Sequence, residues 1–161
     1  MLQEDELFIT IPGSFDKFKP EIDLTIDEFR DLGVTVLAPD KGWLYKSPLK
    51  VFTKDDMVNF FRPLPSEIGM RIKEIEDSFL ESIRKSDLVY IVNPEGFIGE
   101  TVSFEIGFAL GRGIPIYSQK SILTQDLIMQ TMIADIKVLT PQEAATDAKE
   151  QKLLKNSVKS L

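Results

Sequence analysis

A set of five short apolar runs, separated by segments with helical periodicity, constrains the fold of this chain more than any other feature. Each run is rich in Ile, Val and Leu, which is typical of strands that are buried on both faces of a parallel sheet. Strands that alternate with helices predict a doubly wound α/β sheet with right-handed crossovers. We therefore expect one sheet of five parallel strands, with helices on both faces, at residues 7–11, 34–37, 88–92, 114–117 and 136–139.

The segments between these runs carry apolar residues at the three- and four-residue spacing of amphipathic helices. The clearest stripe follows Pro65, and Ser66 is its predicted N-cap. A further helix is expected over residues 122–132. The apolar stripes of the first three helices consist of Leu24, Phe29 and Leu32; of Ile68, Ile72, Ile75, Phe79 and Ile83; and of Val102, Ile106, Ala109 and Leu110.

The length of 161 residues suits a single domain with a sizeable core. Residues 39–65 are long for a connection between a strand and a helix, and they are rich in aromatic side chains. Such a segment is either a lid-like insertion over a ligand or a surface loop packed by its own aromatic residues, and the sequence favours the two equally. The polar tail over residues 147–161 has Leu154, Val158 and Leu161 at helical spacing, so we expect a docked or frayed helix without chemistry.

The composition excludes several classes of function. Cys and His are both absent, so the chain has no disulfide, no thiol nucleophile, no Ser-His-Asp triad and none of the usual zinc sites. Catalysis must therefore use carboxylates, hydroxyls, Lys, Arg or the backbone. The formal net charge of −7 argues against a nucleic-acid polymer or an anionic membrane as a partner. The N-terminus lacks the zones of a signal peptide and no apolar run has the length of a membrane span, so we expect a cytoplasmic protein.

Ligands of doubly wound sheets bind beyond the C-terminal ends of the strands, and the sequence "IPGSFD" follows the first of them. Gly13 allows the backbone to approach a ligand closely. Ser14 offers a hydroxyl and an N–H group where a helix can begin, which suits a phosphate or a carboxylate. A plain turn with a helix cap explains the same residues more often.

Glu105 is a carboxylate within an apolar helical segment, "GETVSFEIGFA". If Thr101 caps this helix, Glu105 lies one position beyond the place of a capping-box glutamate. On a helical wheel it lies at the edge of the apolar stripe, so we expect it to be partly buried. A partly buried carboxylate needs a partner or a function, and the spacing alone favours a functional glutamate and a paired or solvated one equally.

The stretch "SDLVYIVNP…GETVSFEIGFALGRGIPIY" resembles the signature of the nucleoside 2-deoxyribosyltransferase-like family. In that signature an Asp and a buried strand lead to a Gly-rich loop, then to "E-[IL]-G-[YF]-A" and "G-[KI]-P-[IV]". The "GSF" after the first predicted strand resembles the related 2′-deoxynucleoside 5′-monophosphate N-hydrolases. The resemblance spans residues 7–117 with gaps, and "FEIGFA" is its most specific part. It implies a flavodoxin-like sheet.

The resemblance implies an enzyme that cleaves the N-glycosidic bond of a deoxynucleoside or deoxynucleotide. The glutamate of the matched motif is the family's nucleophile, and it corresponds to Glu105. The sugar would be held covalently on this glutamate and then passed to another base or to water, as in retaining glycosidases. This chemistry needs no metal and no cofactor, and the partner would be a small nucleoside or nucleotide. A homo-oligomer is expected by analogy alone.

The family also carries a second carboxylate, which assists the leaving base or binds the sugar. The family register places it about ten positions before Asp87, which gives Asp77. The helical wheel favours Glu76 instead, because Asp77 points away from the apolar stripe while Glu76 lies at its edge. We prefer Asp77 and keep Glu76 as the alternative. The residues expected to bind the substrate are Gly13, Ser14, Phe15, Gly99, Glu100 and Thr101.

The chain departs from the family in three ways and leaves other functions open. Ile9 stands where the transferases carry a Tyr, and Gly99, with Glu100 adjacent, stands where they often carry an Asp. The hydrolases have a phosphate-binding Ser in that loop, to which Thr101 and Ser103 are only near. The main alternative is a non-catalytic nucleotide-binding or sensor module that uses the same pocket. A flavin-binding protein is disfavoured, because the loop after the first strand is short and lacks a run of Ser and Thr for a phosphate.

Overall fold

The computed structural model describes the chain except for residues 1–5, 16, 40–48, 53–57, 62–70 and 161. Five parallel strands form one sheet in the order β2-β1-β5-β6-β7. The third of these strands along the chain is β5, so the order in chain numbering is 2-1-3-4-5, which is that of the flavodoxin-like doubly wound fold. The strands are β1 (Phe8–Thr10), β2 (Thr35–Ala38), β5 (Leu88–Ile91), β6 (Ile116–Ser118) and β7 (Lys137–Val138).

The predicted sheet is therefore confirmed, because each of the five apolar runs overlaps one of these strands. Alternate residues of β5 explain why the run is apolar throughout. Leu88 and Tyr90 pack into the core on one face of the sheet, and Val89 and Ile91 pack into the core on the other. A strand that is buried on both faces needs apolar side chains at every position.

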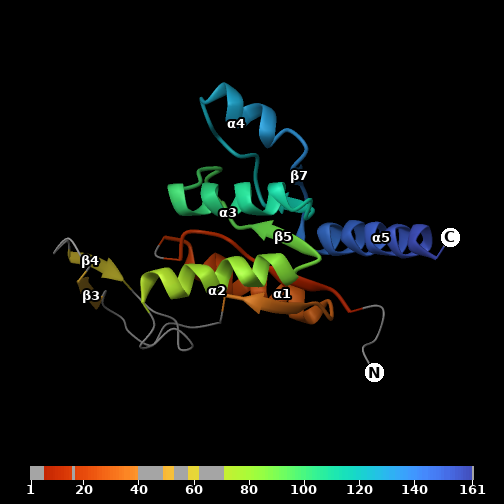
Figure 1. Cartoon of the computed structure of the whole chain (residues 1–161), viewed down its shortest axis with the longest axis horizontal. Coiled ribbons are helices and arrows are strands. Elements are labelled where there is room, and N and C mark those ends of the chain that lie inside the picture. The colour runs from red at the N-terminus through yellow and green to blue at the C-terminus, as the bar shows by residue number, and fades with distance from the viewer. Residues whose placement is uncertain (1–5, 16, 40–48, 53–57, 62–70, 161) are drawn as a thin grey trace.

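Two pairs of helices cover the two faces of the sheet (Figure 1). On one face, α1 (Lys19–Asp31) and α5 (Pro141–Lys159) pack against the core that contains Tyr90. On the other face, α2 (Ile72–Lys85) and α3 (Glu100–Gly111) pack against the core that contains Ile91. The short helix α4 (Leu127–Met132) has no buried residue. Within the described part of the chain, no helix is both long and apolar enough to cross a membrane.

The structure corrects the apolar stripe that was predicted for the first helix. In α1 the buried apolar residues include Ile22 and Phe29, whereas Leu24 and Leu32 are 62% and 41% exposed. Leu24 and Phe29 are five positions apart, so they cannot share one narrow face of a helix. The predicted N-cap Ser66 lies outside the described residues, and α2 begins at Ile72. The N-cap of α3 is Gly99 and not Thr101.

The segment 39–65 contains a structure that the sequence analysis did not predict. The strands β3 (Leu49–Phe52) and β4 (Val58–Phe61) form an antiparallel pair that is separate from the main sheet. In Figure 1 this pair lies at the opposite end of the molecule from the C-terminus of α5. Most of the remaining segment lies outside the described residues, so the predicted lid stays a prediction.

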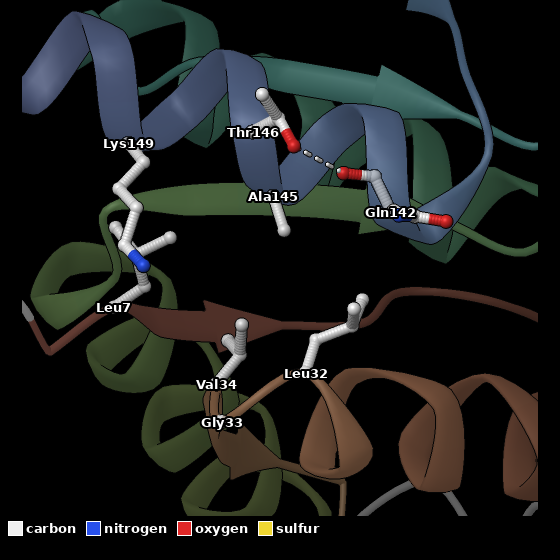
Figure 2. Close-up of a pocket in the computed structure, with 8 residues that line it drawn as sticks. All are labelled: Leu7, Leu32, Gly33, Val34, Gln142, Ala145, Thr146 and Lys149. Atoms are coloured by element: carbon white, nitrogen blue, oxygen red, sulfur yellow. Dashed lines mark hydrogen bonds between the residues drawn. The ribbon is translucent and has the colours of Figure 1, made fainter.

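The tail expected over residues 147–161 is the greater part of α5, which begins earlier, at Pro141. Its first half is docked, because Ala144 and Ala148 are buried and the Tyr117 hydroxyl donates a hydrogen bond of 2.6 Å to Asp147 Oδ2. Figure 2 shows a pocket of about 170 Å³ where this half of α5 faces β1 and the turn that precedes β2. The second half is exposed, and Figure 1 shows it extending beyond the sheet.

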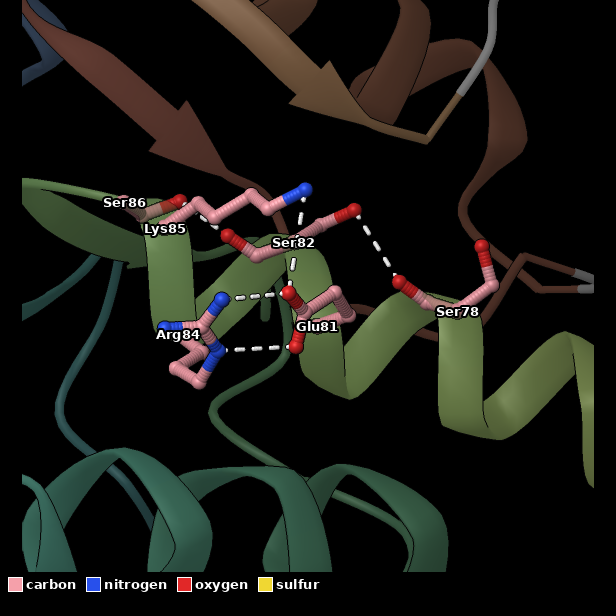
Figure 3. A network of polar contacts seen from close by, with 6 residues as sticks. All are labelled: Ser78, Glu81, Ser82, Arg84, Lys85 and Ser86. Carbon is pink, nitrogen blue, oxygen red and sulfur yellow. Dashed lines mark hydrogen bonds and ion pairs between the residues drawn. The ribbon is translucent and has the colours of Figure 1, made fainter.

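The polar face of α2 is occupied by contacts within the helix (Figure 3). The Ser82 hydroxyl donates to the Ser78 carbonyl, and the Ser86 hydroxyl donates to the Ser82 carbonyl. Glu81 forms ion pairs with Arg84 and Lys85. Exposed pairs of this kind stabilise a helix by about 0.2–0.5 kcal/mol each.

Candidate functional site

The candidate site is a pair of carboxyl groups between α2 and α3. Glu105 of α3 is only 4% exposed, and it shares the buried side of that helix with Val102 and Ile106. Glu76 of α2 is half-buried, and its side chain forms a hydrogen bond with Glu105. One oxygen of Glu76, Oε1, is buried without a hydrogen-bond partner. We call these two residues the Glu76–Glu105 pair.

The electrostatics of the Glu76–Glu105 pair keep one proton on it. Burial, followed by the charge and the hydrogen bond of Glu76, raises the pKa of Glu105 to about 9. Burial also raises the pKa of Glu76, although its hydrogen bond with Glu105 acts in the opposite direction. No Lys or Arg among the described residues forms an ion pair with either carboxyl group. The raised pKa therefore favours a neutral Glu105 at neutral pH, as expected for two carboxyl groups in contact.

Two expectations about this site are corrected. Glu105 is fully buried rather than partly buried, because α2 covers the edge of the stripe on α3 and brings Glu76 against it. Asp77 does not face Glu105: its side chain is 57% exposed and forms an ion pair with Lys73, one turn earlier in α2. Adjacent residues of a helix point about 100° apart, so Glu76 and Asp77 cannot both face α3. The helical wheel was therefore a better guide than the family register.

The loop after β1 approaches the same end of α2. Gly13 forms a parallel bridge with Val92, and a Cβ atom on Gly13 would lie 3.1 Å from the Val92 carbonyl oxygen. This close approach explains why a glycine suits the position. The Phe15 ring meets the Phe79 ring edge-on at 6.0 Å, and Phe79 lies one turn after Glu76.

From the sequence we expected Ser14 at the start of a helix, but the structure places it in the turn before α1. Its carbonyl accepts a hydrogen bond of 2.8 Å from the Phe18 N–H group, and Phe18 is the N-cap of α1. Ser14 therefore belongs to the turn that leads into α1, which is the plainer of the two interpretations of "IPGSFD".

Gly99, Glu100 and Thr101 lie together at the N-terminal end of α3. The Gly99 carbonyl accepts hydrogen bonds from the N–H group and the hydroxyl of Ser103, at 3.0 and 2.8 Å. Glu100 and Thr101 are exposed in the first turn, whereas Glu105 is on the buried side of the next turn. Among the described contacts, none joins these three residues to the Glu76–Glu105 pair, so their role in binding stays a prediction.

The sequence analysis missed Asn93, which connects two loops at the C-terminal edge of the sheet. Asn93 follows β5 and is completely buried. Its amide group donates to the Lys120 carbonyl at 2.9 Å, and its carbonyl oxygen accepts from the Lys120 N–H group at 3.0 Å. A polar residue directly after a fully apolar strand is the signal that could have identified it.

Asn93→Ala is expected to lower the free energy of unfolding by about 1–2 kcal/mol, because the Lys120 backbone groups lose both of their partners. Denaturant unfolding of the variant and the wild type measures this difference. Glu95→Ala, two positions away and exposed, is the matched control and should leave stability within about 0.5 kcal/mol of the wild type. Equal stabilities of Asn93→Ala and the wild type would mean that the two hydrogen bonds do not contribute.

Comparison with known proteins supports the fold and leaves the activity open. No family model matches the chain, and no curated protein matches it either. Among solved structures, the chain is similar to the crystal structure of a conserved protein from Enterococcus faecalis V583, with a TM-score of 0.56 and 15% sequence identity. The match covers 91% of this chain and 99% of the other. At this identity the likeness shows the flavodoxin-like α/β fold alone.

Proposed function

We propose that this protein cleaves the N-glycosidic bond of a deoxynucleoside or deoxynucleotide, and that the Glu76–Glu105 pair carries out the chemistry. The observation that carries the proposal is the buried contact between two carboxyl groups whose pKa values are both raised. Such a pair offers an acid and a nucleophile in one place, which a retaining glycosidase-type mechanism requires. The resemblance of "FEIGFA" to the nucleoside 2-deoxyribosyltransferase-like motif supports the assignment of Glu105 as the nucleophile.

In the first step, the substrate binds beside the two carboxyl groups while they are still in contact. The proton of Glu105 passes to Glu76, so that Glu105 becomes ionised as its partner becomes an acid. The Glu105 carboxylate then forms a bond to the anomeric carbon while the bond from that carbon to the base breaks. Glu76 gives its proton to the departing base. The products are a free base and a deoxyribosyl ester of Glu105.

In the second step, water or another base attacks the anomeric carbon of this ester. The ionised Glu76 accepts the proton that the attacking molecule loses, and the Glu105 carboxylate is released. The proton is then shared by the Glu76–Glu105 pair again. The protein ends each cycle in its starting state without a metal, a cofactor or a histidine.

The direct experiment is incubation of the protein with a panel of 2′-deoxynucleosides and their 5′-monophosphates, with separation of the products to detect free base. We expect base release from at least one member of the panel. The corresponding ribonucleosides are the matched controls, since the proposed substrate is the deoxy sugar. Absence of free base from every member, with and without a second base as acceptor, would contradict the proposal.

One observation favours the alternative, a nucleotide-binding module without turnover. The raised pKa of Glu105 keeps this carboxyl group neutral at physiological pH, and a neutral carboxyl group is not a nucleophile. In that case Glu105 would act as a hydrogen-bond donor to a bound ligand. Binding of an intact deoxynucleotide without release of base identifies this function.

A further inference from the structure

The side of α3 that points away from the sheet is exposed and partly apolar. Phe104 is 61% exposed, and Gly107 and Gly111 are exposed on the same side of the helix. Phe108, one turn after Phe104, is half-buried, and the Arg112 guanidinium lies 4.3 Å from the centre of its ring. Residues three, four and seven positions apart share one side of a helix. These residues therefore form one surface, which we call the outer face of α3.

The two glycines of the outer face are not explained by the fold of the chain. Glycine is among the weakest helix formers, and neither Gly107 nor Gly111 has a positive φ that would require it. A Cβ atom at either position would meet no atom of the described residues within 4 Å, so close packing within the chain does not require a glycine there. Glycines one turn apart do allow a helix from another molecule to approach closely.

The two ends of the outer face carry opposite charges. Glu100 is exposed in the first turn of α3, and Arg112 is exposed directly after its last turn. None of the ion pairs of the described residues includes either of them. A surface with one negative and one positive end is complementary to a copy of itself that runs in the opposite direction. The charges therefore favour a second copy of this chain as the partner, with the two α3 helices antiparallel.

The apolar residues of the outer face fit the same arrangement. Phe104 and Phe108 are four positions apart, and so are Gly107 and Gly111. When two copies of α3 run antiparallel, Phe104 of each copy can face Gly111 of the other while Phe108 faces Gly107. A large side chain opposite a glycine fills the space that the glycine leaves, so the face is complementary to itself in shape as well as in charge.

We propose that the protein forms a twofold dimer in which the outer faces of two α3 helices pack antiparallel, with Arg112 of each copy paired with Glu100 of the other. With the phenylalanines opposite the glycines, Arg112 lies about 4.5 Å along the helix axis from the position opposite Glu100. The long side chain of an arginine spans this offset. The inference does not depend on the proposed function, because Glu105 is on the buried side of α3.

The size of the outer face determines how strong the dimer should be. α3 has 12 residues, which gives a length of about 18 Å. A surface of this length is smaller than the about 800 Å² that each partner buries in a stable complex. We therefore expect a reversible dimer that forms at micromolar and higher concentrations of the protein.

The test is sedimentation equilibrium of the full-length protein between about 5 and 500 µM, the range in which a weak dimer dissociates. We expect the average mass to rise with concentration from 18.3 kDa towards twice that value. Gly107→Leu should weaken the dimer by at least about tenfold, because the leucine side chain occupies the space of the facing Phe108. The leucine meets no atom of its own chain at Cβ, so the variant should fold.

Two charge variants test the pairing directly. Glu100→Arg gives the outer face a positive charge at both ends, and Arg112→Glu gives it a negative charge at both ends. Each variant alone should dimerise at least about tenfold more weakly than the wild type, because like charges face each other. An equimolar mixture of the two should dimerise about as well as the wild type, since opposite charges face each other again. Glu150→Arg, on an exposed position of α5, is the matched control and should dimerise as the wild type does.

Three results would overturn the proposal. A wild type that stays at 18.3 kDa over the whole concentration range is a monomer. A wild-type dimer that Gly107→Leu and Glu100→Arg weaken no more than Glu150→Arg does is formed by another surface. Charge variants that stay monomeric when they are mixed exclude the antiparallel pairing of Glu100 with Arg112.

Discussion

Glu105→Gln is expected to lower the rate of base release by at least about a thousandfold, because the amide cannot form the ester on which the proposed mechanism depends. Glutamine keeps the size of the side chain and can still donate to Glu76, so the variant should fold and retain most of its affinity for the substrate. The measurement is the steady-state rate for the deoxynucleoside or deoxynucleotide that the wild type cleaves, together with binding of the same compound to the variant.

Asp77→Asn is the matched control for this prediction. It removes one negative charge from α2, at the position next to Glu76. Asp77 lies on the exposed side of that helix, so the rate of the variant should be close to that of the wild type. Glu76→Gln should lower the rate, and more so for bases that need protonation to depart. Retained turnover in Glu105→Gln, or loss of turnover in Asp77→Asn alone, would contradict the assignment of the pair.

The covalent step can be observed separately. A slow substrate should leave a mass increase of one deoxyribosyl unit on the peptide that contains Glu105 and not on the peptide that contains Glu76. The same mass increase on Glu76 would reverse the roles of the two carboxyl groups. This result matters because the pKa of Glu105 is about 9 in the free protein, and a carboxyl group is a nucleophile only after it has lost its proton.

The sheet could be predicted from the sequence because the signal for it is local and repeated. Buried parallel strands need apolar residues on both faces, and the run at residues 88–92 has them at every position. The first helix was predicted less well. Leu24 was assigned to its buried face by hydrophobicity, but its side chain is 62% exposed whereas Phe29 is fully buried. The face of a helix that is buried depends on where the sheet lies. The position of a single leucine does not identify that face.

Of the candidate site, the sequence identified Glu105 but not its full burial or its partner. Glu105 was singled out because a carboxylate at the edge of an apolar stripe is unusual, and the resemblance of "FEIGFA" to a family motif decided for a functional role. Its full burial and its partner could not be predicted from α3 alone, because they result from the packing of α2 against α3. The periodicity of α2 distinguished Glu76 from Asp77, since only one of two adjacent helix positions can face a neighbouring helix. The position of Asn93 directly after an apolar strand marks it in the sequence, but its partner, the backbone of Lys120, is set by the fold.

The proton on the Glu76–Glu105 pair also predicts how the stability of the protein depends on pH. The pKa of Glu105 rises from its ordinary value of 4.5 to about 9 in the folded protein. Between these values the folded state binds one proton more than the unfolded state, so the free energy of unfolding falls as the pH rises. One proton corresponds to about 1.4 kcal/mol per pH unit, so from pH 6 to pH 8 the wild type should lose about 2–3 kcal/mol relative to Glu105→Gln, which has no proton to lose.

Denaturant unfolding of both proteins at several pH values between 6 and 8 measures this difference. Asp77→Asn removes a carboxylate from the exposed side of α2. Its free energy of unfolding should therefore change with pH as that of the wild type does. Parallel curves for the wild type and Glu105→Gln would show that no proton is held by the pair. A buried carboxyl pair with no catalytic role has the same effect on the pH dependence of the free energy of unfolding. A protein in which Glu105→Gln removes both the pH dependence and the turnover uses the shared proton in catalysis, whereas loss of the pH dependence alone identifies a structural pair.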